Sequence, residues 1–279
     1  MRSPGANEEN AEKSEHPTGE APDLLVERTG QATWITLHRP AARNALTLGV
    51  LARARDALRG AGTDSSVRCV VIAGAGGHFC AGADLRQSFQ DDPQLMDHLE
   101  SYMDAFHGLI EAVVRCPKPV VASLEGAAVG FGADLAFACD LRVAATTAYV
   151  QEKFVGLGLM PDGGGTFWLP RLVGTARAMQ MILLAERVDA AELLRLGVVT
   201  KVVQADALRE ATFEVVRSLE AGPPLAFAAI KRSLYASWGS FEDALRRERE
   251  EQLRLLVSRD VQEGVAAWAE KRAPSFIGR

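Results

Sequence analysis

A single carboxylate stands inside a glycine-rich stretch, GLGLMPDGGGTFWLP, at residues 156–170. Asp162 follows an apolar run and precedes three consecutive glycines, while Phe167 and Trp168 add apolar surface after it. A carboxylate in such a dry setting has a raised proton affinity and can move a proton near neutral pH. The alternative is that Asp162 caps a helix that begins at about Thr166. The stretch therefore predicts either a proton-transfer group or a helix cap.

Two other turns are built from small residues. In HFCAGADL, Ala81, Gly82 and Ala83 let another group approach the backbone closely. If a helix starts there, the Ala83 N–H is a free donor. In GAAVGFGADLAFACD, glycines flank Phe131 and a short apolar helix follows, whose free N–H groups suit a developing negative charge.

Together the two turns can direct two N–H donors at one oxygen, which is the design of an oxyanion hole. Each turn taken alone is equally an ordinary connection between a strand and a helix. Neither has the full GxGxxG pattern with a following acidic ribose ligand, so a dinucleotide loop is not indicated.

Composition limits the class of protein. The 279 residues carry a net charge of −5, whereas nucleic-acid binders usually show a basic patch or stripe. No apolar run approaches the roughly 20 residues of a membrane helix, and the N-terminus lacks the apolar core of a signal peptide. The four cysteines have no spacing that suits zinc, so we expect free buried thiols, no metal site and a cytoplasmic protein.

The elements that would position these turns follow an α/β pattern. A strand, a glycine turn and a helix recur three times, which requires crossover connections. Two strands joined at Thr29–Gly30 open the ordered chain, and a helical pattern begins at Leu46. We expect a disordered polar tail at residues 1–22, a core at 23–205 and a helical C-terminal region at 206–279.

The combination of motifs resembles the enoyl-CoA hydratase/isomerase (crotonase) superfamily. The motifs that carry the resemblance are ITLHRPAARNAL, HFCAGADLR, GAAVGFGADLAFACDLRVA, GLGLMPDGGGTFWLPRLVG and EGVAAWAEKRAPSFIGR. They occur in the order and spacing of that superfamily and cover about residues 23–279. They are highly specific for the superfamily and much less specific for the reaction.

The resemblance implies a spiral of repeated ββα units with a C-terminal helical region that builds trimers, which commonly pair into hexamers. It implies an acyl-CoA thioester as substrate, with coenzyme A entering as part of it and no separate cofactor. The N–H groups of Ala83 and Phe131 match the oxyanion-hole positions. For coenzyme A binding it implies one set of residues: Arg86, Ala81, Arg43 and the C-terminal pair Phe276 and Arg279, the pair often acting across a subunit boundary.

The carboxylates bear on the reaction. Hydratases of the superfamily use two glutamates, and their positions are held here by Asp134 and Phe154. Glu152 lies two residues from Phe154 and, at strand spacing, is not expected to replace the missing glutamate. Asp162 matches the carboxylate of several isomerases, and its surroundings resemble the ring-oxepin-forming isomerases of phenylacetate breakdown. Those isomerases generally lack an acid at the position of Asp134.

Three functions remain open at this stage. The favoured one is double-bond isomerisation of an enoyl-CoA, with Asp162 as the proton shuttle and Asp134 as a second group. The alternative on the same fold is hydration of a 2-enoyl-CoA between Asp134 and Asp162. The third is a non-catalytic acyl-CoA or RNA-binding module on the same scaffold, although the acidic balance argues against RNA.

Overall fold

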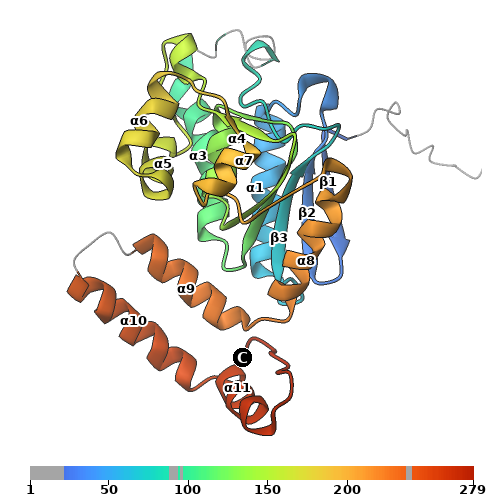
Figure 1. The fold of residues 1–279 in the computed structure, drawn as a ribbon, viewed down its shortest axis with the longest axis vertical. Helices are drawn as coiled ribbons and strands as arrows, with labels where there is room; N and C mark the ends of the chain where they lie inside the picture. The colour runs from blue at the N-terminus through green and yellow to red at the C-terminus, as the bar shows by residue number, and fades with distance from the viewer. Residues whose placement is uncertain (1–21, 88–93, 95–96, 237–240) are drawn as a thin grey trace, which may run out of the picture.

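The computed structural model describes residues 22–87, 94, 97–236 and 241–279 (Figure 1). The predicted N-terminal tail lies outside the described residues, apart from Pro22. The strands are β1 (Leu24–Thr29), β2 (Ala32–Leu37), β3 (Cys69–Gly74), β4 (Val120–Leu124), β5 (Ala127–Val129), β6 (Leu141–Ala145), β7 (Tyr149–Gln151), β8 (Val188–Asp189) and β9 (Lys201–Val203). The helices are α1 (Leu48–Thr63), α3 (Leu99–Arg115), α4 (Phe131–Ala138), α5 (Gly165–Val173), α6 (Thr175–Leu183), α7 (Ala190–Arg195), α8 (Leu208–Glu220), α9 (Pro224–Ala236), α10 (Phe241–Leu256) and α11 (Arg259–Glu270). Short 3-10 turns lie at Pro40–Ala42, Phe154–Leu157 and Ala205–Ala207.

The main sheet has the strand order β1-β2-β3-β4-β6-β9. The β1–β2 hairpin is antiparallel, as the Thr29–Gly30 turn predicts, and the remaining pairs are parallel. A second, smaller sheet joins β5, β7 and β8. The predicted α/β class is confirmed. Parallel strands covered on both faces read as continuous apolar runs, which explains CVVIAG in β3 and VVASL in β4.

Alternate side chains of β3 enter two different cores. Val70 and Ile72 belong to the larger core, which also contains the buried faces of α1 and α3. Cys69 and Val71 point to the opposite face and pack with buried side chains of α8. The sheet is thus covered by α1 and α3 on one face and by α8 on the other (Figure 1).

The C-terminal helices α9, α10 and α11 extend away from the sheet (Figure 1). Polar contacts attach α9 to the core. Lys231 donates to Asp140 Oδ2 at 2.7 Å, and the Tyr235 hydroxyl donates to Asp140 Oδ1 at 2.9 Å. The helical C-terminal region predicted from residue 206 therefore divides in the structure. Its first helix, α8, is part of the core, and only α9–α11 stand apart.

The carboxyl ends of the parallel strands lead directly into the glycine turns. β3 ends at Gly74 and leads into the turn around Ala83, while β4 and β5 lead into the turn at Gly130. Since parallel strands end at the same edge of a sheet, both turns meet there. All four cysteines are buried and unpaired. Among the described residues, no helix is long and apolar enough to cross a membrane.

Candidate active site

The first oxyanion turn, around Ala83, is held by a short parallel bridge to Leu46. Leu46 donates its N–H to the Gly82 carbonyl at 2.8 Å, and Asp84 donates to the Leu46 carbonyl at 2.9 Å. Ala83 lies between these two bonds, and within the part of the chain that the structure describes its amide has no hydrogen-bond acceptor. A short parallel bridge thus holds the Ala83 N–H in place without using it.

The second oxyanion turn starts α4. Gly130 has φ of +55°, a conformation that favours glycine, and Phe131 is the first residue of the helix. The first N–H groups of a helix have no partner inside it, so the Phe131 amide is free to bind an anion. The Phe131 side chain points the other way: it is 2% exposed and packs edge-on against Phe106 at 4.7 Å between ring centroids.

The two turns are in direct contact. Val129 donates to the Cys80 carbonyl at 2.9 Å, and Cys80 donates to the Ala127 carbonyl at 2.9 Å. A Cβ atom added to Gly82 would lie 3.4 Å from the Phe131 amide nitrogen, which places the residue next to Ala83 beside that donor. The structure therefore brings the Ala83 and Phe131 N–H groups close together.

Of the residues expected to bind coenzyme A, three lie beside this place. Ala81 donates its N–H to the Arg43 carbonyl at 3.0 Å, so the two share one strip of backbone. Arg43 is exposed and has φ of +50°, in the left-handed region. Arg86 is also exposed and lies three residues beyond Ala83. Both arginines are therefore exposed to solvent, close in the chain to the first oxyanion turn or hydrogen-bonded to it.

The C-terminal pair lies at the other end of β3. Arg68, which precedes that strand, donates to the Phe276 carbonyl at 2.7 Å. The Arg279 carbonyl accepts the N–H groups of Arg259 and Asp260 at the start of α11. Within one chain, Phe276 and Arg279 are not brought together with Ala83, which follows the opposite end of β3.

Asp162 is half-buried in the turn that precedes α5. Its Oδ1 atom is buried and has no hydrogen-bond partner among the described residues. Burial raises the pKa of Asp162, and the charge of His107 on α3 partly opposes that shift by lowering the pKa. The N-cap residue of α5 is Gly164, and no side chain caps the helix. The alternative that Asp162 is a helix cap is therefore wrong.

Asp134 has a different environment, although it lies next to the same turn. It is in the first turn of α4 and has 0% of its surface exposed. Its Oδ2 atom accepts the Gly163 N–H at 2.8 Å. Burial is the main cause that raises the pKa of Asp134, and the negative charge of Asp162 adds to it.

Glu152 is the residue that the sequence reasoning set aside. It is 1% exposed, and its carboxyl lies beside that of Asp134 next to Gly165. Burial first, and then the charge of Asp134, raise the pKa of Glu152. Strand spacing does not apply to it, because β7 ends at Gln151 and a 3-10 turn begins at Phe154. The signal available in the sequence was an acidic residue two positions from Phe154: these two side chains are buried, whereas Lys153 and Val155 are exposed.

Phe154 occupies space beside the second oxyanion turn. It is 8% exposed, and a Cβ atom added to Gly130 would lie 3.8 Å from its ring. The position that matches the second hydratase glutamate thus contributes an apolar wall. The arrangement as a whole offers two free amides, one accessible carboxyl, one buried acid pair and apolar walls.

Comparisons with known proteins agree with this geometry. A profile of the enoyl-CoA hydratase/isomerase family matches residues 27–279. A probable enoyl-CoA hydratase of Rhodobacter capsulatus is 39% identical over 88% of this chain and 94% of its own length. The 1,2-epoxyphenylacetyl-CoA isomerase of Escherichia coli is 34% identical over the same shares. A crystal structure of an enoyl-CoA hydratase from Polaromonas sp. JS666 superposes with a TM-score of 0.86 at 35% identity, over 91% of this chain and 99% of that one.

Proposed function

The chain belongs to the enoyl-CoA hydratase/isomerase family, and we propose that its reaction is migration of a double bond in an enoyl-CoA thioester. One observation carries the proposal: of the two aspartates at the site, only Asp162 is partly exposed, whereas Asp134 is fully buried. A single accessible carboxyl suits one proton shuttle, because a pair that activates water needs two groups that reach it.

The proposed reaction balances without water or a redox partner. The thioester oxygen binds at the N–H groups of Ala83 and Phe131, and the Asp162 carboxylate removes a proton from C2 of a 3-enoyl-CoA. The C–H electron pair forms a dienolate whose negative oxygen is stabilised by the two donors. Asp162 then returns the proton at C4, so that the double bond lies between C2 and C3. The coenzyme A of the substrate is the only cofactor moiety required.

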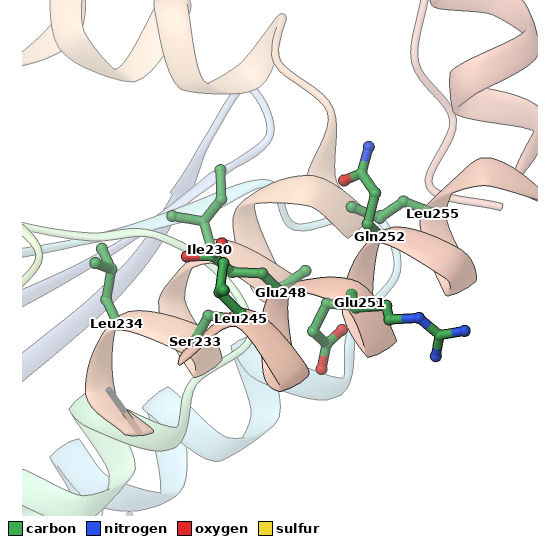
Figure 2. Close-up of a pocket in the computed structure, with 10 residues that line it drawn as sticks. Ile230, Ser233, Leu234, Leu245, Glu248, Glu251, Gln252 and Leu255 are labelled. Carbon is green, nitrogen blue, oxygen red and sulfur yellow. The ribbon is translucent and has the colours of Figure 1, made fainter. Parts of the chain in front are cut away.

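We also propose that Arg43, Ala81 and Arg86 bind the coenzyme A portion, assisted by Phe276 and Arg279 of a neighbouring subunit. This requires an assembly, and we propose a homotrimer or a dimer of trimers. Exposed apolar side chains in the C-terminal region support it, such as Val257 between α10 and α11, 81% exposed, and Trp268 on α11, 82% exposed. A groove of about 590 Å³ between α9 and α10 adds apolar surface (Figure 2). A stable monomer in light scattering at micromolar concentration would contradict the assembly.

The alternative reaction, hydration of a 2-enoyl-CoA, requires a water held by Asp134 and Asp162. It is supported by the bond from the Gly163 N–H to Asp134, which brings that carboxyl next to the residue after Asp162, and it is opposed by the burial of Asp134. A non-catalytic acyl-CoA or RNA-binding module is opposed by the two free amides, whose arrangement suits a developing negative charge. A salt-dependent gel shift tests the RNA version.

The deciding experiment incubates the protein with a panel of enoyl-CoA thioesters in deuterated and ordinary water, followed by mass spectrometry. Isomerisation leaves the mass in ordinary water unchanged and gives a new double-bond position by chromatography. Hydration adds one water to the product. Exchange of the C2 proton for deuterium needs only the base and the oxyanion hole, so its absence on every thioester would refute the proposed function.

A further inference from the structure

The base of the site contains two carboxyl groups that no basic side chain neutralises in the part of the chain that the structure describes. Glu152 and Asp134 are 1% and 0% exposed. Both oxygens of Glu152 and Oδ1 of Asp134 accept no hydrogen bond from an amide, hydroxyl or basic group of the described residues. A buried polar atom without a partner is costly, and a buried charge without one costs more. The two carboxyls must therefore offset this cost by interacting with each other.

The geometry of Gly165 shows how close the two groups come. A Cβ atom added there would lie 2.3 Å from Asp134 Oδ1 and 3.2 Å from Glu152 Oε1. Asp134 Oδ1 and Glu152 Oε1 thus lie close to the same position beside Gly165. Two carboxylates cannot hydrogen-bond to each other unless one of them carries a proton, because an ionised carboxylate is only an acceptor. One shared proton makes Glu152 and Asp134 a hydrogen-bonded acid pair and removes one buried charge.

The acid pair is also the anchor of the turn that carries Asp162. The free oxygen of the pair, Asp134 Oδ2, binds the Gly163 N–H at 2.8 Å. The same added Cβ atom on Gly165 would lie 2.9 Å from the Cβ of Pro161, so Pro161 and Gly165 pack closely together beside the pair. Residues 161–165 thus wrap around the two carboxyls. Pro161 and Gly163 flank Asp162 directly, so the pair binds the backbone immediately after the proposed base and lies close to the residue before it.

We infer that Glu152 is a positioning residue: it shares one proton with Asp134, and the pair holds residues 161–165 so that the Asp162 carboxyl is aimed at the oxyanion turns. The inference rests on the proposed function for its catalytic consequence only. The raised pKa values of Glu152 and Asp134 agree with a proton retained in the folded state. The charged and titratable groups facing the pair are each other and Asp162, which is in turn near His107.

The first test measures the proton. A carboxyl with a raised pKa binds its proton in the folded state but not in the unfolded chain above about pH 4, so folding weakens as pH rises. Each such proton lowers the folding equilibrium constant about tenfold per pH unit. Urea unfolding at fixed protein concentration, from about pH 5 to about pH 9, measures how the free energy of unfolding declines as pH rises. The slope for Glu152→Gln should be shallower than the wild-type slope by the amount that corresponds to about one bound proton. Glu27→Gln, an exposed glutamate of β1, is the matched control and should follow the wild type. Equal slopes for wild type and Glu152→Gln would overturn the inference.

The second test measures the anchoring without substrate. Hydrogen exchange of the Gly163 amide reports its bond to Asp134. Glu152→Gln can still donate a hydrogen bond to Asp134 through its amide, so Gly163 should stay protected. Glu152→Ala removes the partner, and Gly163 should exchange at least about tenfold faster. Unchanged protection in Glu152→Ala would overturn the inference.

The third test links the anchor to the reaction. Misplacing a reacting group by a small distance can lower the rate by up to about 100-fold. Glu152→Ala should lose about 10- to 100-fold in C2 deuterium exchange at unchanged KM, and Glu152→Gln should stay within about threefold of the wild type. If the wild type catalyses C2 exchange and Glu152→Ala does so at the same rate, the inference fails and the proposed function stands. If the wild type exchanges no thioester while the first two tests succeed, the proposed function fails and the anchor stands.

Discussion

The turns that begin α4 and α5 lie side by side, yet they present opposite parts of the chain to the site. At α4 the backbone faces the site, since the Phe131 amide is free while Asp134 is buried beneath it. At α5 the side chain faces the site, since Asp162 is accessible while the neighbouring Gly163 amide is bound by Asp134. The acid of one turn thus satisfies the amide of the other. The comparison teaches that a glycine-rich turn can be catalytic through its amide or through its carboxyl, and that burial decides which.

The glycines of the second turn have specific neighbours. A Cβ on Gly163 would lie 2.6 Å from the Cβ of Asp134, and one on Gly165 would lie 2.3 Å from Asp134 Oδ1. Gly164 has φ of +93°, which L side chains rarely adopt. Gly163 and Gly165 are therefore required because α4 brings Asp134 against this turn, whereas Gly164 is favoured by its backbone conformation.

The largest expected effect tests the carboxyl of the α5 turn. Asp162→Asn keeps the size of the side chain but removes its capacity to transfer a proton. We expect the variant to fold, to bind acyl-CoA and to lose about two to four orders of magnitude in C2 exchange and isomerisation. Mass-detected exchange and acyl-CoA binding by calorimetry measure the two properties separately. Retained exchange would mean that another group is the base.

The backbone of the α4 turn should give the next largest effect. A Cβ on Gly132 would lie 2.3 Å from the Cys80 carbonyl oxygen, so Gly132→Ala must displace the start of α4 and its Phe131 amide. Losing one oxyanion donor costs on the order of 3 kcal/mol, or about two orders of magnitude in rate.

Phe131→Leu is the matched control, because it keeps the amide and most of the buried volume, and it should stay within about threefold of the wild-type rate. Phe131→Ala is less informative, since loss of a buried ring costs about 3–5 kcal/mol of stability. Equal losses in Gly132→Ala and Phe131→Leu would contradict a backbone role.

The pH dependence should be set by the environment of Asp162. The group must be ionised to act as a base, and burial raises its pKa above the ordinary aspartate value. We expect kcat/KM to fall about tenfold per pH unit below that raised pKa and to level off above it. The residual kcat/KM of Asp162→Asn should not show this fall at low pH. If kcat/KM of the wild type falls only at the ordinary aspartate pKa, the Asp162 carboxyl is more solvated than its burial implies.

Sequence reasoning could predict the pieces of the site that are local. The order of elements, the two free amides and the isolation of Asp162 follow from glycine positions, apolar periodicity and motif resemblance within short segments. The residue it missed depends on a contact across the fold: Glu152 follows β7, Asp134 lies in α4, and neither position predicts the other. The role of α8 was hidden for the same reason, because its pairing with β3 and β4 through the second core is a long-range contact.

The smallest expected effect concerns Asp134, and it decides whether the two turns have the roles assigned to them. Asp134→Asn keeps an oxygen that can accept the Gly163 N–H and adds an amide donor that can face Glu152. The acid pair then needs no shared proton, and the turn that carries Asp162 stays in place. We expect a loss of only about three- to tenfold in isomerisation and a larger loss in any hydration activity. Parallel C2 exchange and water-addition assays on one thioester separate the two. If exchange survives Asp162→Asn and disappears in Asp134→Asn, the buried carboxyl is the working base, and hydration becomes the better description of the reaction.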